Sequence, residues 1–392
     1  MIKNEFSMPN SASRLEPVQP DERIPALDVV RGFALMGVLL AYALWNLGSP
    51  PPETYSVTDQ ILNFVLAMLV DTKAYTIFAT LFGLGFAIQM RRGEARGVNF
   101  VKIYRRRLFV LLGIGLAHAI LLRNGDILAP YAIMGFVLLL FRRASNRVLL
   151  IGAVGALLFQ FLAKGVWEMS GVPVPQRPED AGLGYFAENL AWVRYWYSIA
   201  IWNFTPTLTM FLFGLYLGRR FYGNFAIDRK ALRRIAVGGL IAGILVFFGV
   251  PLVWTIPEFS GQAAAARLLW TLHAWSLAVF YVSTLILLLQ KPAWQRRLAP
   301  LGAVGRMALT NYLLQAVIIV PVCLAFNLFG KITPVAGLLL ALGVAVFQIP
   351  FSLWWLKRFE FGPVEWFWRK LTYGRVGQAQ KVERRLTIPI VQ

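Results

Sequence analysis

Residues 334–356 read PVAGLLLALGVAVFQIPFSLWWL, a run without Asp, Glu, Lys or Arg. A helix over this run would be about 34 Å long, enough to cross the roughly 30 Å hydrocarbon core of a bilayer. Similar apolar runs recur along the 392-residue chain. We interpret ten of them as transmembrane helices, at 27–47, 73–90, 106–122, 127–141, 148–166, 203–218, 235–254, 268–290, 307–329 and 334–356.

The composition agrees with a membrane protein. The chain is 58% hydrophobic and only 15% charged, whereas soluble domains carry about 25% charged residues. We therefore predict an all-α integral membrane protein of about ten transmembrane helices. Two further segments are expected as short helices at the outer surface: 57–71, interfacial or re-entrant, and 185–198, which mixes Trp and Tyr with charge and would be an interfacial anchor or a lid.

The net charge of +20 is distributed unevenly. With the N-terminus inside, 31 of the 39 Lys and Arg residues fall in cytoplasmic segments and five in outer segments. This asymmetry follows the positive-inside rule and predicts that both termini are cytoplasmic. The asymmetry means that the basic residues face anionic lipid headgroups and the cytoplasm. This accounts for the positive net charge, so no nucleic-acid partner is expected.

Polar side chains at membrane depth need a partner or a function. On the cytoplasmic side, Asp28 and Arg31 are three residues apart on one helical face and are expected to pair. Two interpretations remain open: a structural ion pair, or an arginine that helps to hold an anionic ligand. The run Arg105-Arg106-Arg107 could add to the same positive field or simply anchor its helix.

On the outer side, His118 lies about five residues below the end of its predicted helix, and the tight turn to Asp126 brings that carboxylate beside it. A neutral histidine oriented by a carboxylate can act as a general base or proton relay, so His118 and Asp126 are the candidate catalytic residues. A buried histidine that is merely hydrogen-bonded is the alternative. The second histidine, His273, has no acid nearby in the sequence.

Asn311 and Gln315 are four residues apart and share a face of their predicted helix. They would either join helices by hydrogen bonds or line a substrate cavity. Close helix packing is expected at Gly214-xxx-Gly218 and Gly239-xxx-Gly243, and at four glycines (Gly83, Gly85, Gly113 and Gly115) between the second and third spans. Cys323 is alone, which excludes an internal disulfide, and no metal cluster, nucleotide-binding glycine loop or serine-nucleophile motif is found.

Several stretches resemble the bacterial YeiB-like inner-membrane proteins, whose C-terminal part is a domain of unknown function. They are Arg23-Ile-Pro-Ala-Leu-Asp-Val-Val-Arg-Gly, Leu81-Phe-Gly-Leu-Gly-Phe, His118-Ala, Gly125-Asp-Ile-Leu, Gly305-Arg-Met-Ala-Leu-Thr-Asn-Tyr-Leu-Leu-Gln and Gly362-Pro-Val-Glu-Trp-Phe-Trp-Arg-Lys-Leu-Thr-Tyr. The resemblance implies a multi-pass protein of the bacterial cytoplasmic (inner) membrane. Its expected parts are a tail (1–22), an N-terminal membrane region (23–218), the C-terminal domain of unknown function (219–374) and a second tail (375–392).

The family is in turn similar to transmembrane acyltransferases of the heparan glucosaminide N-acetyltransferase type, which share an opening like Leu27-Asp28-xx-Arg31-Gly32. This similarity implies transfer of an acyl group from cytoplasmic acyl-CoA to an outer-leaflet or periplasmic acceptor, with no tightly bound cofactor. Asp28, Arg31, Asn311 and Gln315 are then candidate substrate-binding residues. Tyr42 is a fifth, although such relatives often have His or Asn at its position.

Two other functions remain open from the sequence. One is a proton-coupled transporter or exporter of a small molecule or lipid, with His118 and Asp126 as the proton relay. The other is a non-catalytic membrane scaffold. Whether the chain pairs as a homodimer is also left open.

Overall fold

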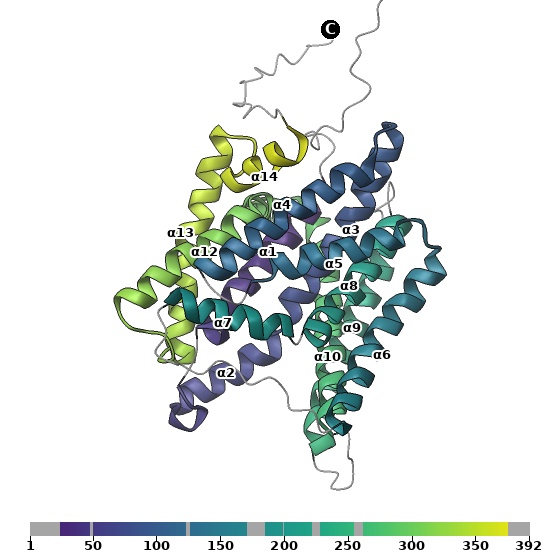
Figure 1. Cartoon of the computed structure of the whole chain (residues 1–392). Coiled ribbons are helices and arrows are strands. Elements are labelled where there is room, and N and C mark those ends of the chain that lie inside the picture. The colour runs from purple at the N-terminus through teal and green to yellow at the C-terminus, as the bar shows by residue number, and fades with distance from the viewer. Residues whose placement is uncertain are drawn as a thin grey trace, which may run out of the picture.

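The structure is a computed structural model that describes residues 24–47, 50–122, 126–170, 185–198, 200–221, 228–254 and 262–374. The predicted tails (1–22 and 375–392), Arg123 and the part of the predicted outer loop between 171 and 184 lie outside these residues. The described chain is all-α, as predicted (Figure 1). Its main helices are α1 (Pro25–Ala41), α2 (Val57–Leu69), α3 (Lys73–Ala95), α4 (Phe100–Leu121), α5 (Leu128–Leu140), α6 (Asn146–Met169), α7 (Tyr185–Ser198), α8 (Ala200–Phe221), α9 (Arg229–Trp254), α10 (Gln262–Leu289), α11 (Pro292–Arg306), α12 (Ala308–Ala325), α13 (Pro334–Arg358) and α14 (Pro363–Tyr373).

Each of the ten predicted spans coincides with a helix, but the helices differ in their capacity to cross a membrane. Seven helical stretches of the described residues are long and apolar enough to do so, one of them uniting α2 and α3. The helices α4, α5 and α8 are not among the seven. With 13 residues, α5 is only about 20 Å long. The chain is therefore a multi-pass membrane protein whose helices are of unequal length.

Apolar side chains point outward along short and long helices alike. Examples are Leu140, Ile151, Leu245 and Val346, of which Val346 is 73% exposed. Such a surface is unfavourable in water and is solvated by lipid chains in a bilayer. The lipid bilayer is thus the environment that this fold requires.

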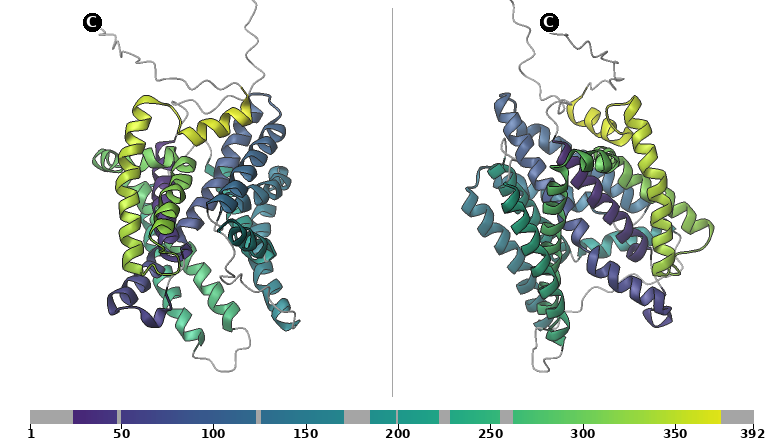
Figure 2. Two further views of the ribbon diagram at one scale, coloured as in Figure 1. Left: turned by 60° about the vertical axis from the view of Figure 1, so that its left-hand side comes forward. Right: turned by 180° about the vertical axis from the view of Figure 1, so that it is seen from behind.

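Positively charged residues gather at one end of the bundle, which we call the basic end. The end of α3 carries Arg92, the end of α8 carries Arg219 and Arg220, and the end of α13 carries Lys357 and Arg358. Figures 1 and 2 show α14 lying across this end, where α1 also begins. The basic end corresponds to the side that the sequence predicts to be cytoplasmic.

Glycines allow the closest helix contacts. A Cβ atom on Gly32 of α1 would lie 1.9 Å from the Leu301 carbonyl oxygen of α11, and one on Gly305 would lie 1.9 Å from the Asp28 carbonyl oxygen. The two backbones therefore touch, and this contact brings Asp28 beside the start of α12. Because α1 and α11 come from opposite ends of the chain, the N-terminal and C-terminal regions pack as one bundle.

The two predicted GxxxG contacts are confirmed. Gly214 packs on Thr80 of α3, and Gly239 packs on Ser276 of α10, each so closely that a Cβ would collide with a backbone oxygen. The predicted contact between the glycines of the second and third spans is wrong. Gly83 packs on α8 and Gly115 packs on α5, because α3 and α4 each lie closest to a different helix.

The helix α2 lies obliquely at the end opposite the basic end (Figure 1). Its apolar residues Val57, Ile61 and Phe64 are exposed, which fits the predicted interfacial helix. Three side chains contact the last carbonyl oxygens of α2. Lys73 Nζ donates to that of Ala67 at 2.9 Å, and Tyr281 Oη donates to that of Leu69 at 2.9 Å. His273 Nε2 lies 3.0 Å from that of Met68. These contacts satisfy carbonyls that a helix end leaves without partners.

Candidate functional site

A cavity of about 310 Å³ extends from the basic end into the bundle. One face of α3, together with Arg96 directly after its end, forms the longest wall, which continues through Arg92, Gln89 and Leu81 to Phe78. Arg96 lies 18 residues after Phe78, so this wall is about 27 Å long. The other walls come from α1, α4, α5, α11, α12 and α14.

The basic end of the cavity is rich in arginine. Six arginines line it, against two carboxylates, Asp28 and Glu365; the six are Arg31, Arg92, Arg96, Arg107, Arg306 and Arg369. Arg31 Nη1 donates to Asp28 Oδ1 at 2.7 Å, so the predicted pair is confirmed. Because both of its residues line the cavity, the pair lies where it can meet a ligand. The excess of guanidinium groups favours anions such as phosphates.

The deep part of the cavity is apolar and aromatic. Phe78 and Phe82 of α3, Ile127, and Tyr131 of α5 line it together with Tyr312 of α12. The Tyr131 ring lies edge-on to Tyr75 and Phe82, with ring centroids 5.8 and 5.6 Å apart. An extended ligand would therefore have its charged part among arginines and its other end against tyrosine and phenylalanine rings.

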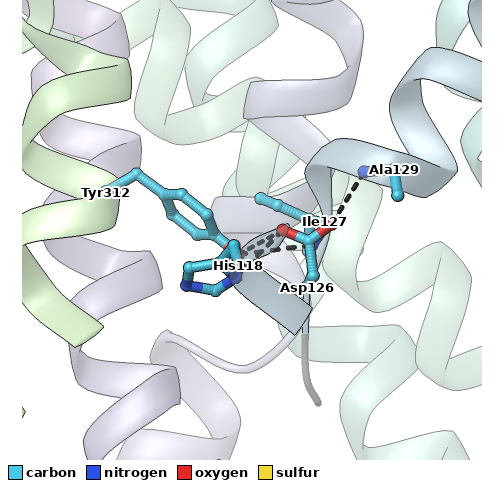
Figure 3. A network of polar contacts seen from close by, with 5 residues as sticks. All are labelled: His118, Asp126, Ile127, Ala129 and Tyr312. Carbon is cyan, nitrogen blue, oxygen red and sulfur yellow. Dashed lines mark hydrogen bonds and ion pairs between the residues drawn. The ribbon is translucent and has the colours of Figure 1, made fainter. Parts of the chain in front are cut away.

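Tyr312 also belongs to a buried polar cluster, which it forms with His118 and Asp126 (Figure 3). His118 Nδ1 is 3.1 Å from Asp126 Oδ1, and the two side chains are only 2% and 3% exposed. The Tyr312 hydroxyl donates to the same Oδ1 at 3.4 Å and accepts the Ile127 N–H at 3.2 Å. The Tyr312 and His118 ring centroids are 5.1 Å apart. The predicted approach of His118 and Asp126 is thus present, with Tyr312 as a third member.

Local structure fixes Asp126 at this place. Its Oδ2 accepts the Ala129 N–H at 2.7 Å, which caps the start of α5. A Cβ on Gly115 would lie 2.4 Å from the Ala129 nitrogen and 2.7 Å from Asp126 Oδ2. Because Gly115 lacks that atom, α4 and α5 approach closely and the carboxylate reaches His118.

The two ring nitrogens of His118 differ in their surroundings. Within the part of the chain that the structure describes, neither ring nitrogen meets hydrogen-bond geometry, but Nδ1 is at ion-pair distance from Asp126 and Nε2 has no such neighbour. A buried imidazole nitrogen without a partner is costly and is a typical property of a reactive group. A turn of the ring would direct Nδ1–H to the carboxylate and leave the Nε2 lone pair as the base.

The helix α7 closes the other side of the cluster. Asn189 Nδ2 donates to the Ile120 carbonyl oxygen at 3.2 Å, and the Tyr185 hydroxyl donates to that of Leu122. Both carbonyls belong to the last turn of α4, just beyond His118. The predicted outer helix therefore covers the end of α4, where it can act as a lid as well as an anchor.

Asn311 and Gln315 face α13 and do not line the cavity. Asn311 Nδ2 donates to Ser352 Oγ at 2.9 Å, and Gln315 Nε2 donates to Gln348 Oε1 at 3.3 Å. Gln348 Nε2 in turn donates to the Asn311 carbonyl oxygen at 2.7 Å. These buried bonds match the predicted joining of helices, and they involve both residues without any substrate.

Tyr42 is buried in a π-helical segment, Tyr42–Asn46, that continues α1. It does not line the cavity. It packs with Ala316 and Val320 of α12, in the turns that follow Tyr312. Tyr42 is therefore near the polar cluster without being one of its members.

Sequence reasoning missed Tyr312 and Glu365 as site residues. Tyr312 directly follows Asn311, but sequence reasoning considered only the helix face that Asn311 shares with Gln315. Glu365 entered the sequence analysis only as part of the stretch from Gly362 that carries the family resemblance. Both contact groups more than 50 residues away in sequence, such as Asp126 and Leu309. No local pattern could have indicated these contacts. The described residues hold no group of three His, Cys, Asp or Glu side chains suited to a metal ion.

Fold and site together define a multi-pass helical membrane protein with a basic cavity at one end and a buried His–Asp–Tyr cluster, of which Tyr312 lines that cavity. Comparison with known families specifies this class further. Residues 23–252 match the family described as heparan-alpha-glucosaminide N-acetyltransferase, catalytic, and residues 217–375 match a protein family of unknown function. The chain belongs to the YeiB-like family, which is related to these acetyltransferases.

Curated relatives cover almost the full length. The chain is 34% identical to the uncharacterized protein YxaH of Bacillus subtilis, over 92% of this chain and 97% of that protein. It is 34% identical to an uncharacterized 39.9 kDa protein of Bacillus acidopullulyticus, with the same coverage. It is 27% identical to the uncharacterized protein YeiB of Escherichia coli, over 91% and 98%.

Proposed function

We propose that this protein transfers an acyl group from acyl-CoA, bound from the cytoplasmic side, to an acceptor at the other side of the membrane. The observation that carries the proposal is the cavity itself, which leads from six arginines to Tyr312, whose hydroxyl contacts Asp126 of the buried His118–Asp126 pair. The match to an acetyltransferase catalytic family supports the same class of reaction.

The basic end would hold the donor. The phosphates of acyl-CoA carry several negative charges, and guanidinium groups bind phosphate with charge-assisted hydrogen bonds. Arg31 is one such group, and its pairing with Asp28 orients the side chain along the cavity wall. The pantetheine arm and thioester would extend along α3 towards the aromatic floor.

The polar cluster would perform the transfer. The nucleophilic oxygen or nitrogen of the acceptor attacks the thioester carbonyl carbon, the carbon–sulfur bond breaks, and coenzyme A leaves as the thiolate. His118 Nε2 takes the proton that the acceptor loses and returns it to the thiolate sulfur, while Asp126 stabilises the intervening imidazolium. Tyr312 is the member of the cluster that lines the cavity, and its hydroxyl holds the Asp126 carboxylate in place.

A proton-coupled transporter is the alternative function, favoured by one observation: His118 and Asp126 form a buried titratable pair at membrane depth. Transport would require the cavity to open alternately at both ends, with α7 leaving the end of α4. Substrate uptake that depends on a proton gradient and is lost in His118→Ala would favour this function.

The test uses purified full-length protein in lipid nanodiscs with a panel of labelled acyl-CoA donors. Donor binding and release of coenzyme A are measured for wild type, Arg31→Ala and His118→Ala. The matched control is Arg296→Ala, because Arg296 is exposed, lies in a segment that the sequence predicts to be cytoplasmic and does not line the cavity.

We expect Arg31→Ala to weaken donor binding about tenfold, since it removes a charge-assisted contact. His118→Ala should bind the donor and release almost no coenzyme A. The control should match wild type in both measurements. Folded wild type that binds no donor from the panel would contradict the proposal and make transport the leading explanation.

A further inference from the structure

Two helix N-termini from distant parts of the chain meet at the wall of the cavity. Helix α11 ends at Arg306, and Met307, with φ −109° and ψ 35°, interrupts the helical path before α12 begins at Ala308. The interruption leaves the first N–H groups of α12 without partners in their own helix. Inside a membrane protein such groups need another acceptor.

Glu365 of α14 supplies that acceptor. Its Oε1 accepts the N–H of Leu309 at 2.7 Å and that of Thr310 at 3.0 Å, and its Oε2 accepts the Thr310 hydroxyl. Thr310 Oγ1 in return accepts the N–H of Val364 at 3.1 Å, in the first turn of α14. Each helix thus caps the other, as the two residues of a capping box do within one helix.

We call this reciprocal capping of α12 and α14 the cross-cap. Close packing around Gly362 leaves no space for another arrangement of the capping side chains. A Cβ on Gly362 would lie 2.2 Å from Glu365 Oε2 and 2.7 Å from Thr310 Oγ1. Further along α14, Trp368 Nε1 donates to the Arg107 carbonyl oxygen at 3.0 Å. The Arg107 guanidinium lies 3.9 Å from the Trp368 ring centroid. Burial raises the pKa of the Glu365 carboxyl, and the hydrogen bonds from Thr310 and Leu309 counter that rise.

The capped end of α12 lies one helical turn from the polar cluster. Tyr312 is three residues after Leu309, and its hydroxyl contacts Asp126 at 3.4 Å. That distance is near the upper limit of a hydrogen bond, so a small displacement of α12 would break the contact. The position of the cap therefore decides whether Tyr312 reaches Asp126.

We propose that Glu365 is a positioning residue for the acyl transfer: by capping α12 it keeps the Tyr312 hydroxyl at Asp126. The inference rests on the function proposed above. It gives α14, within the family region of unknown function, a defined task in the reaction. Glu365 acts through Tyr312, and it does not contact the thioester.

The first test compares the turnover of Glu365→Ala and Glu365→Gln in two backgrounds, wild type and Tyr312→Phe. Glu53→Ala is the control, because it removes an exposed carboxylate outside the site. In the wild-type background, Glu365→Ala should lower kcat about tenfold and change the donor KM by less than about threefold. Glu365→Gln keeps an acceptor oxygen for the two N–H groups and should retain most of the turnover.

In the Tyr312→Phe background, Glu365→Ala should cause almost no further loss, because residues that act through one contact are not additive. An equal loss in both backgrounds, or a rise in KM with unchanged kcat, would overturn the inference.

A second measurement does not depend on enzymatic activity. Hydrogen exchange of residues 308–313 should become at least about tenfold faster in Glu365→Ala than in Glu53→Ala, since the Leu309 and Thr310 amides lose their acceptor. Unchanged exchange would overturn the inference. Faster exchange in a protein whose wild type has no turnover would contradict the proposed function while supporting the capping of α12 by Glu365.

Discussion

The chain has two histidines, and both are buried, but their surroundings differ. His273 has both ring nitrogens close to backbone oxygens, Nδ1 at 2.8 Å from the Gly243 carbonyl and Nε2 at 3.0 Å from that of Met68. His118 has one carboxylate beside Nδ1, and Nε2 has no partner among the described residues. Both nitrogens of the first ring are covered by carbonyl oxygens of α9 and α2, whereas the second ring has a nitrogen left for chemistry.

This difference teaches that burial alone does not identify a functional histidine. A neutral imidazole donates from one ring nitrogen only, so it can bond only one of the two carbonyls beside His273, and the other carbonyl keeps a substrate from the second nitrogen. A carboxylate on one side and an unused nitrogen on the other is the arrangement of a general base. Four predictions test this comparison.

The largest effect is expected for His118→Ala. Loss of the general base should lower coenzyme A release by about 10² to 10⁴-fold while the donor still binds. Release is measured by thiol titration in nanodiscs, with Arg296→Ala as control. Near-normal release would assign His118 to structure only and remove the distinction between the two histidines.

His273→Ala should act on stability. It leaves the Met68 and Gly243 carbonyl oxygens without a side-chain partner, so the free energy of unfolding should fall by about 1–3 kcal/mol. Thermal unfolding in detergent gives the change, and donor binding should remain within about threefold of wild type. A His273→Ala protein of normal stability that has lost turnover would reverse the roles assigned here.

Tyr312→Phe removes only the hydroxyl that contacts Asp126. A neutral hydrogen bond contributes about 0.5–1.5 kcal/mol, so turnover should fall about tenfold or less. Steady-state kinetics on the variant measure this loss. An effect as large as that of His118→Ala would mean that Tyr312 itself exchanges protons with the substrate.

The smallest effect is expected for the double variant Gln315→Leu with Gln348→Leu. Replacing both partners of a buried hydrogen bond by apolar groups of similar shape is nearly neutral. Turnover and donor binding should stay within about twofold of wild type. A marked loss of donor binding would return Gln315 to the substrate site that the sequence suggests.

Much of the fold followed from the sequence, because the hydrophobic signal of a membrane helix is local. Every predicted span contains a helix, and the segment predicted as a short interfacial or re-entrant helix contains α2, which exposes an apolar stripe. Contacts over short separations were also predictable. Asp28 and Arg31 are one helical turn apart, and His118 and Asp126 are only eight positions apart in the sequence.

Contacts over long separations were not predictable in the same way. The sequence placed Asn311 and Gln315 on one face, but only packing shows that this face meets Ser352 and Gln348. Tyr312 reaches Asp126 across 186 positions because α1 and α11 touch at two glycines and thereby set the place of α12. Such contacts depend on the relative positions of helices, which hydropathy does not encode.

The cross-cap between α12 and α14 also sets an order of events during synthesis. The amides of Leu309 and Thr310 find their acceptor in a residue made 56 and 55 positions later. At about 5–20 residues per second, the ribosome needs roughly 3–11 s to reach Glu365. Throughout that interval the start of α12 has no partner from its own chain, so the cavity wall can be completed only when the last helix emerges. A chain that stops short of Pro363 should insert its spans and still lack a finished site.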